Sequence, residues 1–269
     1  MEKEVIIKVE NITKILGGRR VLDGVNLDIR KGETTVIMGG SGCGKSTLLR
    51  NMVGVLTPDE GRICIKEKDI TQISSREMDE MRKKFGMLFQ GAALFDSMSV
   101  FENIALPLRE HTKLAEHIIK IMVKMKLELV GLGGFENYMP AQLSGGMKKR
   151  VGLARAIAMD PEILFCDEPT AGLDPVVGGA IDKLISDLTN KLDITCIVVT
   201  HDMNSVFRIA DSIAMLYKGK ILQVGTPDEI KNTKNETVRQ FINGSPEGPI
   251  RFMDAGDDYL QRLTEGEMT

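Results

Sequence analysis

The sequence lacks three features, each of which would have indicated a different class of protein. No apolar run approaches the roughly 18–20 residues that span a bilayer. The first residues, Met1 to Glu4, open with charges rather than with an apolar segment, so we expect no signal peptide. Thirty-five Lys and Arg against 38 Asp and Glu give a formal net charge of −3, which argues against a general nucleic-acid binder. Any role at a membrane is therefore expected to come through a partner.

Cysteine is also scarce, and its spacing excludes two kinds of site. No CxxC pair occurs, so neither a zinc site nor a disulfide framework is expected, and the thiols are predicted to be reduced in a cytoplasmic setting. With 269 residues, 42% of them hydrophobic and 27% charged, the chain can form a globular domain with an ample core. The four cysteines are Cys43, Cys64, Cys166 and Cys196.

The first third of the chain has the periodicity of strands. Residues 5–9 and 21–29 alternate apolar and polar side chains, as half-buried strands do. Residues 34–38 form a short apolar, β-branched run that leads directly into a glycine-rich loop, and a helix is expected to follow over 46–53. Residues 85–89 are another strand-like run. This part of the sequence therefore predicts sheet structure with one helix after the loop.

Helical and strand-like segments alternate in the remainder. Residues 100–130 carry apolar stripes of helical spacing. Residues 163–166 and 194–200 are apolar runs typical of strands buried on both faces of a parallel sheet, and a helix is predicted at 175–192 with Pro in its first turn. The order predicts a doubly wound α/β core with a helical insertion at about 91–160.

The glycine-rich loop predicts nucleotide binding. Glycines let successive backbone N–H groups turn toward phosphate oxygens at the positive end of a helix dipole. Lys45 would neutralise β/γ-phosphate charge and the Ser46 hydroxyl would ligate Mg²⁺, while Thr47 would lie near the α/β-phosphates. The strand and helix around the loop favour ATP or GTP binding over a flexible turn with an incidental lysine. The loop residues are Gly39, Gly40, Ser41, Gly42, Cys43, Gly44, Lys45, Ser46 and Thr47.

Two acids follow the apolar run at 163–166. Asp167 should emerge from a buried strand beside the P-loop, where it can hold Mg²⁺ directly or through water. Glu168 should point to the other side of the strand end, where a carboxylate can polarise an attacking water. A pair of solvated acids at a strand end is the alternative, and the P-loop makes it less favoured.

Between these segments, the run Leu143-Ser144-Gly145-Gly146-Met147 resembles the signature of ATP-binding cassette (ABC) ATPases. The resemblance covers about residues 5–242 and includes the motifs in order. It implies a P-loop NTPase (RecA-like) core of residues 1–90 and 161–244 with an N-terminal antiparallel β portion, and an α-helical subdomain at about 91–160. Residues 245–269 are expected to form a tail. Ser144 suits the N-cap of a helix that is predicted from Gly145 to about Met159. The resemblance implies that Ser144, Gly145 and Gly146 contact ATP held by a second copy in a homodimer.

The resemblance assigns roles to further residues. Gln90 looks like the glutamine that senses Mg²⁺ and couples to membrane partners, Asp174 like the aspartate that crosses the dimer interface, and His201 like the histidine that contacts the γ-phosphate. Leu16 stands where the family commonly stacks an aromatic residue on adenine. ATP and Mg²⁺ are the implied cofactors. The expected catalytic residues are Lys45, Gln90, Glu168 and His201, and the expected metal ligands are Ser46, Gln90 and Asp167.

Two positions depart from the family pattern. Leu16 replaces an aromatic residue, which predicts weaker discrimination between bases, and Met147 replaces a glutamine, which removes one polar contact. The three basic residues after the signature, Lys148, Lys149 and Arg150, are expected to form a solvated helix face. We also expect that alkylation of Cys43 blocks hydrolysis and that ATP protects the thiol, because an adduct would fill the phosphate cradle.

Within the family, the stretch from Phe89 to Ile104 and the signature ending in Met147 look most like the ATPases of Mla/Mce-type phospholipid transporters. That resemblance implies integral-membrane permease subunits, MCE-type lipid-binding subunits and a location on the cytoplasmic face of the bacterial inner membrane. A groove beside Gln90 and Phe95 should receive a permease helix. Transport of a small polar solute, a soluble non-transport ABC ATPase and a non-catalytic nucleotide-binding regulator are the alternatives.

Overall fold

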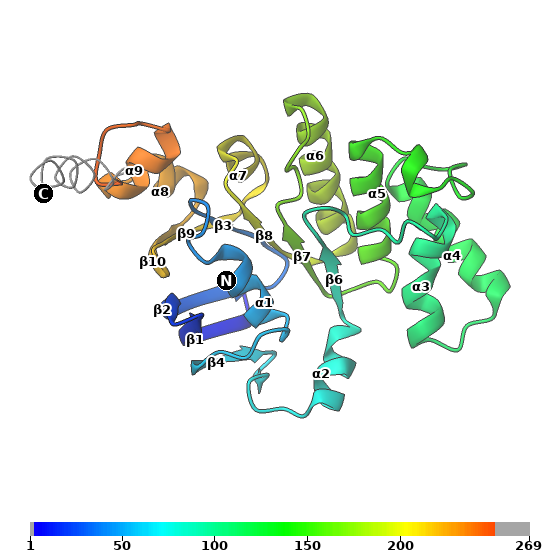
Figure 1. Cartoon of the computed structure of the whole chain (residues 1–269), viewed down its shortest axis with the longest axis horizontal. Helices are drawn as coiled ribbons and strands as arrows, with labels where there is room; N and C mark the ends of the chain where they lie inside the picture. Colours follow the sequence, from blue (N-terminus) through cyan, green and yellow to red (C-terminus); the bar gives the residue numbers. More distant parts are fainter. Residues whose placement is uncertain (1–2, 251–269) are drawn as a thin grey trace, which may run out of the picture.

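Two β-sheets organise the chain, which a computed structural model describes over residues 3–250. The smaller sheet is antiparallel, in the order β2-β1-β4-β5 (Figure 1). The first strand runs seven residues past the predicted 5–9, whereas the second exceeds the predicted 21–29 by two residues at its start and one at its end. Their register shifts between Val9 and Ile12, around Asn11 at φ 53°, and this irregularity ends the strict alternation on which the prediction depended. The strands are β1 (Val5–Leu16), β2 (Arg19–Arg30), β4 (Glu60–Ile65) and β5 (Lys68–Asp69).

The larger sheet has the strand order β10-β9-β3-β8-β7-β6. Its neighbours are parallel from β9 to β6, and β10 is antiparallel to β9. β3, β7 and β8 are buried at every residue, which explains their uninterrupted apolar runs. The strands are β3 (Thr34–Met38), β6 (Phe85–Leu88), β7 (Ile163–Asp167), β8 (Thr195–Thr200), β9 (Ser212–Tyr217) and β10 (Lys220–Gly225).

Strand β8 lies between the P-loop strand β3 and the acidic strand β7. The carboxyl ends of all three parallel strands still share one edge of the sheet, so residues that follow them can meet. The α/β fold with a parallel sheet and an N-terminal antiparallel portion is confirmed.

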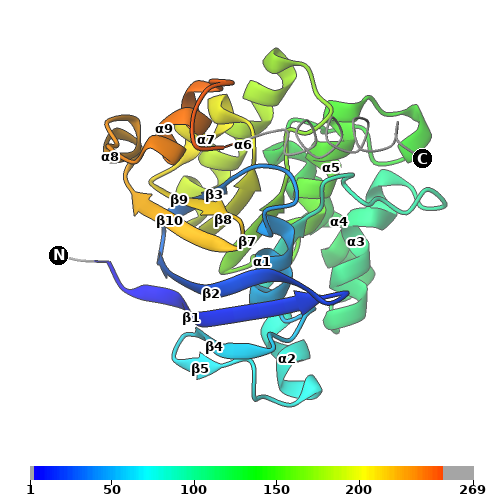
Figure 2. The same cartoon turned by 60° about the vertical axis from the view of Figure 1, so that its left-hand side comes forward.

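The two faces of the larger sheet bury different partners. Side chains on one face, such as Val36 and Val198, share a core with the helices from α3 to α7. Side chains on the other, such as Ile37 and Phe165, pack against α1 and the small sheet, and Figure 2 shows α1 between the two sheets. The helices outside the insertion are α1 (Lys45–Met52), α2 (Ser75–Arg82), α6 (Pro175–Leu192), α7 (Met203–Ile209), α8 (Pro227–Lys231) and α9 (Glu236–Asn243).

The helical insertion consists of α3 (Val100–His111), α4 (Glu116–Leu129), the short 3-10 helix Pro140–Gln142 and α5 (Gly145–Ala156). The single periodic stretch predicted at 100–130 is thus two helices, because the chain turns between His111 and Glu116. Helix α5 begins where Ser144 predicts and ends three residues before the predicted Met159. These helices gather on one side of the sheet, beyond β6 in Figure 1.

No helix within residues 3–250 combines the length and apolar character needed to cross a bilayer. Of the predicted tail at 245–269, the part from 251 onward lies outside the described residues. Residues 245–250 are hydrogen-bonded to α9. Gln240 accepts from the backbone N–H of Ile250 at 2.6 Å and donates to the carbonyls of Ile250 and Ser245 at 3.0 and 3.2 Å.

Candidate functional site at the carboxyl edge of the parallel sheet

The P-loop connects β3 to α1 and leaves no room for side chains at two of its glycines. A Cβ on Gly39 would lie 2.2 Å from the Leu216 carbonyl oxygen, and one on Gly44 would lie 2.9 Å from the Val21 carbonyl oxygen. Gly44 also has φ 109°, which favours glycine. Ser41 and Gly42 are exposed, whereas Cys43 is buried. The loop therefore presents backbone rather than side chains, as a phosphate cradle requires.

Lys45 is folded back across this loop. Its buried Nζ donates to the carbonyl oxygens of Gly39 at 2.8 Å and Gly40 at 3.1 Å, and it lies 3.8 Å from Glu168 Oε1. The helix that begins at Lys45 has Gly44 as its N-cap and no side-chain capping bond. Its first N–H groups are thus available to an anion.

Ser46 and Asp167 meet although they are 121 positions apart. The Ser46 hydroxyl donates to Asp167 Oδ1 at 3.0 Å. A hydroxyl and one carboxylate beside a phosphate cradle match the way Mg²⁺ binds, through few protein oxygens together with waters and substrate phosphates. Within residues 3–250, no cluster of three or more His, Cys, Asp or Glu side chains forms a protein-only metal cage. The residues present therefore fit Mg²⁺ held jointly with a nucleotide.

Glu168 and His201 also lie together. His201 Nδ1 is 2.9 Å from Glu168 Oε1, and Thr200 Oγ1 donates to Glu168 Oε2 at 3.2 Å. The His201 side chain is 58% exposed and that of Glu168 only 11%, so the carboxylate is fixed at the base of the site and the imidazole faces outward. Glu168 has φ 48°, a left-handed conformation that is uncommon for a residue with a side chain.

The other expected site residues lie outside this cluster. Gln90 follows β6 and is exposed. Leu16 ends β1 and is 41% exposed. Asp174 caps α6, where its Oδ1 accepts from the backbone N–H groups of Val176 and Val177, both at 3.0 Å. The capping bonds explain why a helix begins at Pro175, and they hold the Asp174 carboxylate close to its own backbone.

The signature residues form the N-terminus of α5, away from the P-loop of their own chain. Ser144 Oγ caps the helix by accepting from the Met147 N–H at 3.3 Å. Ser144 and Gly145 are exposed, and Gly146 is packed so that a Cβ would lie 2.6 Å from Val177 Cγ1. In Figure 1, β7 and β6 lie between α1 and α5. Met147 packs against the apolar core, which explains an apolar residue at this position.

The expectation of a solvated basic face on α5 is wrong for Lys149. This side chain is only 5% exposed, and its Nζ donates to the Gln90 carbonyl and, at 3.1 Å, to the Glu168 carbonyl. Burial lowers the Lys149 pKa. The spacing of Gly146, Lys149 and Leu153, three and then four residues, places them on one helix face, and that periodicity was the available signal. Arg150 instead donates to the Val130 carbonyl at 3.0 Å.

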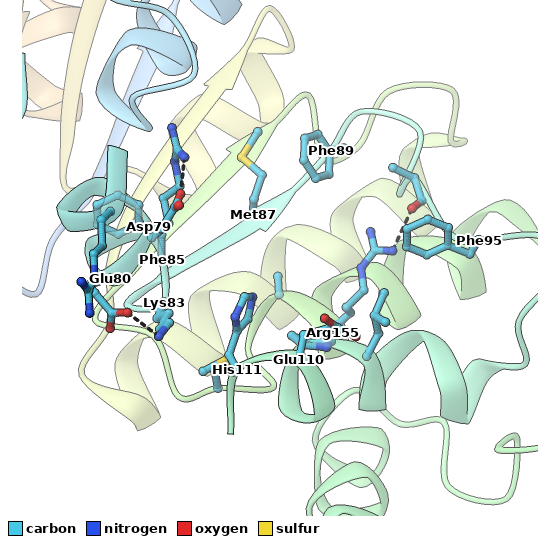
Figure 3. Close-up of a pocket in the computed structure, with 17 residues that line it drawn as sticks. Asp79, Glu80, Lys83, Phe85, Met87, Phe89, Phe95, Glu110, His111 and Arg155 are labelled. Carbon is cyan, nitrogen blue, oxygen red and sulfur yellow. Dashed lines mark hydrogen bonds and ion pairs between the residues drawn. The ribbon is translucent and has the colours of Figure 1, made fainter. Parts of the chain in front are cut away.

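A groove of about 810 Å³ lies beside the segment that follows β6. Its walls come from α2, β6, α3 and α5 (Figure 3). Phe89 and Phe95 line it and are 45% and 49% exposed. Arg155 extends toward Phe95 in Figure 3, with its guanidinium carbon 6.0 Å from the ring centroid. The lining of the groove therefore includes both exposed aromatic rings and side chains of the helix that carries the signature.

Comparisons with known proteins agree with these motifs. Residues 22–171 match the family model described as "ABC transporter". The chain is 45% identical over 260 residues to the intermembrane phospholipid transport system ATP-binding protein MlaF of Haemophilus influenzae, which covers 97% of this chain and 98% of that protein. It is 43% identical to the probable ribonucleotide transport ATP-binding protein mkl of Mycobacterium leprae, over 96% of this chain and 74% of that one. The resemblance to phospholipid-transport ATPases is thus confirmed in sequence.

Solved structures give the same answer for the fold. A dimeric ATP-binding cassette in a post-hydrolysis state, bound to ADP and phosphate, is 33% identical with a TM-score of 0.75, covering 82% of this chain and 98% of that one. The protein cbiO1 from Clostridium perfringens, part of an ABC transporter complex, is 33% identical with a TM-score of 0.79, covering 98% and 100%. The chain therefore belongs to the ABC transporter family, as an ATP-binding subunit that hydrolyses ATP.

Proposed function

We propose that this chain is the ATPase subunit of a phospholipid transport system, working as a homodimer beneath a membrane permease. The observation that carries the proposal is its 45% identity, over nearly the full length of both chains, with the phospholipid transport ATPase of H. influenzae. Permease subunits, MCE-type lipid-binding subunits and a place on the cytoplasmic face of the bacterial inner membrane belong to the same proposal.

The ATP site is proposed to lie where the P-loop meets Asp167. Backbone N–H groups of the loop and of the first turn of α1 would bind the phosphates, and Lys45 would exchange its two carbonyl contacts for β/γ-phosphate oxygens. Ser46 and Asp167, 3.0 Å apart, would hold Mg²⁺, with Gln90 approaching from the end of β6. When bound, Mg²⁺ neutralises phosphate charge. Leu16 would contact the base through apolar surface.

Glu168 is proposed to orient and polarise the attacking water. Thr200 and His201 hold its two carboxylate oxygens, so the side chain is aimed before substrate arrives. The exposed imidazole of His201 can turn toward a γ-phosphate without leaving the site. General-base assistance of this kind typically contributes a factor of about 10²–10⁴.

The second half of each ATP site is proposed to come from the other copy. Ser144 caps a 12-residue helix that begins with Gly145 and Gly146; its N-terminus carries partial positive charge, and β7 and β6 lie between this helix and the helix that follows its own P-loop. Asp174, which begins the neighbouring helix α6, would lie at the same dimer interface. A permease helix would enter the groove beside Gln90, with Phe89 and Phe95 as its apolar contacts.

The sharpest test of the catalytic proposal is Glu168→Gln. Because the amide keeps the size of the side chain but cannot accept a proton from water, ATP binding should persist, turnover should fall by at least about 10²-fold, and ATP should trap a dimer. Turnover would be followed by phosphate release and the dimer by size-exclusion chromatography with Mg²⁺ and ATP. Wild-type turnover in this variant would remove Glu168 from the reaction.

Transport of a ribonucleotide is a second candidate, favoured by the 43% identity with the mycobacterial protein. Affinity purification of the tagged chain from membranes separates the two. Co-purified phospholipid and an MCE-type subunit would support lipid transport. Permease subunits without lipid, and ATPase activity stimulated by ribonucleotides in proteoliposomes, would favour the second candidate instead.

A further inference from the structure

One buried side chain connects three of the motifs described above. Lys149 lies one turn into α5, behind the signature, and its ammonium donates to the backbone carbonyls of Gln90 and Glu168. Gln90 follows β6 and is the neighbour of Phe89, which lines the groove, and Glu168 directly follows β7. Gln90 lies 59 positions before Lys149 in the chain, and Glu168 lies 19 positions after it.

Lys149 contacts the backbone of Glu168, and this backbone is in an unfavourable conformation. Glu168 has φ 48°, which an L-residue adopts only when the surrounding structure holds it. Its N–H donates to the Val199 carbonyl at 2.9 Å, and its own carbonyl accepts from Ala171 N–H at 3.2 Å as well as from Lys149. Moving this carbonyl would rotate the peptide and shift the carboxylate relative to His201.

A second cation on the same helix shows what Lys149 adds. Arg155 donates to the carbonyls of Ala92 at 2.7 Å and Ala93 at 2.8 Å. The segment after Gln90 therefore remains attached to α5 without the lysine. Among residues 3–250, the side-chain hydrogen bond from α5 to Glu168 comes from Lys149 alone.

We propose that Lys149 is a positioning residue for ATP hydrolysis, holding the backbone of Glu168 from the helix that carries the signature. The proposal rests on the function proposed above, in which Glu168 acts on ATP in its own chain while the N-terminus of α5 faces ATP in the second copy. Lys149 then connects the two ATP sites of the dimer through a single side chain, and it connects both to the segment at Gln90, next to the groove residue Phe89.

The test is Lys149→Met in the full-length chain, which keeps most of the length of the unbranched side chain and removes its charge and donors. We expect kcat to fall at least about tenfold, with KM for ATP and the Kd of a fluorescent ATP analogue each within about threefold of wild type. Lys148→Met makes the same chemical change one residue earlier, at a half-buried position, and should leave kcat within about twofold. Lys149→Arg, which keeps the charge and donors, should restore part of the rate.

Action through Glu168 gives a second readout. In a Glu168→Gln background, Lys149→Met should reduce the residual single-turnover hydrolysis by less than about twofold, because the group it positions is already gone. An equal tenfold loss in both backgrounds, or a loss of ATP affinity that accounts for the rate, would overturn the proposal. If Lys149→Met does not fold, Lys149→Gln is measured in the same two backgrounds with the same criteria.

The result also separates this inference from the function on which it rests. An inactive Glu168→Gln together with normal kcat in Lys149→Met would overturn the positioning role alone. Wild-type turnover in Glu168→Gln would overturn the catalytic role of Glu168 and the inference with it.

Discussion

Two helix N-termini in this protein are proposed to bind phosphate, and they are built in opposite ways. The N-cap of helix α1 is Gly44, which is in a left-handed conformation and supplies no side-chain capping bond. Helix α5 begins at Ser144 in an extended conformation, and the serine hydroxyl accepts from the Met147 N–H at 3.3 Å. The N-terminus of α1 therefore leaves its first N–H groups to a ligand, whereas at the N-terminus of α5 the hydroxyl of Ser144 already accepts from one of them.

Their surroundings differ as well. The start of α1 is enclosed by Lys45, Asp167 and Glu168, so charges for a nucleotide and its metal are already gathered in the chain. The start of α5 presents Ser144 and Gly145 to solvent. We therefore expect α1 to anchor a nucleotide within its own chain, and α5 to contribute to an ATP site when a second copy brings a nucleotide to it. Four experiments test this difference between the two helix N-termini.

The largest effect is expected at α1 with Lys45→Met. The variant loses the charge-assisted bonds to phosphate, each worth about 1.5–3 kcal/mol, so the Kd for ATP should rise about 100-fold. Titration with a fluorescent ATP analogue measures this. The thermal midpoint without nucleotide should stay within a few degrees, although the bonds to Gly39 and Gly40 are lost. An affinity within threefold of wild type would contradict the assignment.

Alkylation of Cys43 should come next. Burial raises the Cys43 pKa above its ordinary value, so less thiolate is present at neutral pH and the reaction with iodoacetamide should keep accelerating above pH 9. Bound ATP should slow modification about tenfold or more, and activity should fall in step with the modified fraction, followed by mass spectrometry. Cys43→Ser provides the control. Full activity after complete modification of Cys43 would refute the expectation.

A smaller effect is expected at α5 with Ser144→Ala. Loss of an N-cap costs about 1 kcal/mol, which corresponds to about a fivefold change in an equilibrium. Turnover should fall about fivefold through weaker dimerisation, with unchanged ATP affinity of the single subunit. Ser99→Ala is a matched control, because Ser99 caps α3 by accepting from Glu102 N–H at 3.2 Å. Equal turnover losses in the two variants would mean that Ser144 only stabilises its helix.

The smallest effect is expected from Met147→Gln, which restores the residue that the family usually has. Met147 packs on the apolar core, so a polar side chain there should lower the thermal midpoint slightly. The change in turnover should stay below about threefold, measured by phosphate release at saturating ATP. A tenfold increase would show that the missing polar contact limits this enzyme.

Features that depend on short stretches of sequence were predicted well. The strand at 34–38 and the helix at 175–192 have the predicted bounds, and each depends on short-range features: a buried apolar run in the first case, and Asp174 followed by Pro175 in the second. Ser46 and Asp167 were expected to meet, and they do. That expectation required only that parallel strands share an edge where their carboxyl ends lie.

Predictions that depended on which face of an element is covered were less successful. Lys149 was expected in solvent because three basic residues in a row usually form an exposed helix face, yet α5 packs on several sides and buries it. The extent of β1 was underestimated, since the turn of the chain at Asn11 interrupts alternation without ending the strand.

The family, the phosphate loop, the acidic pair and the helix capped by Ser144 could be predicted from short stretches of sequence, because neighbouring residues encode each of them and their local conformation carries the chemistry. The packed fold was needed to show that β8 lies between the P-loop strand and the acidic strand, that His201 and Thr200 hold Glu168, and that Lys149 reaches two backbone carbonyls. These contacts join distant segments, and the burial that makes them possible is a property of the packed elements together.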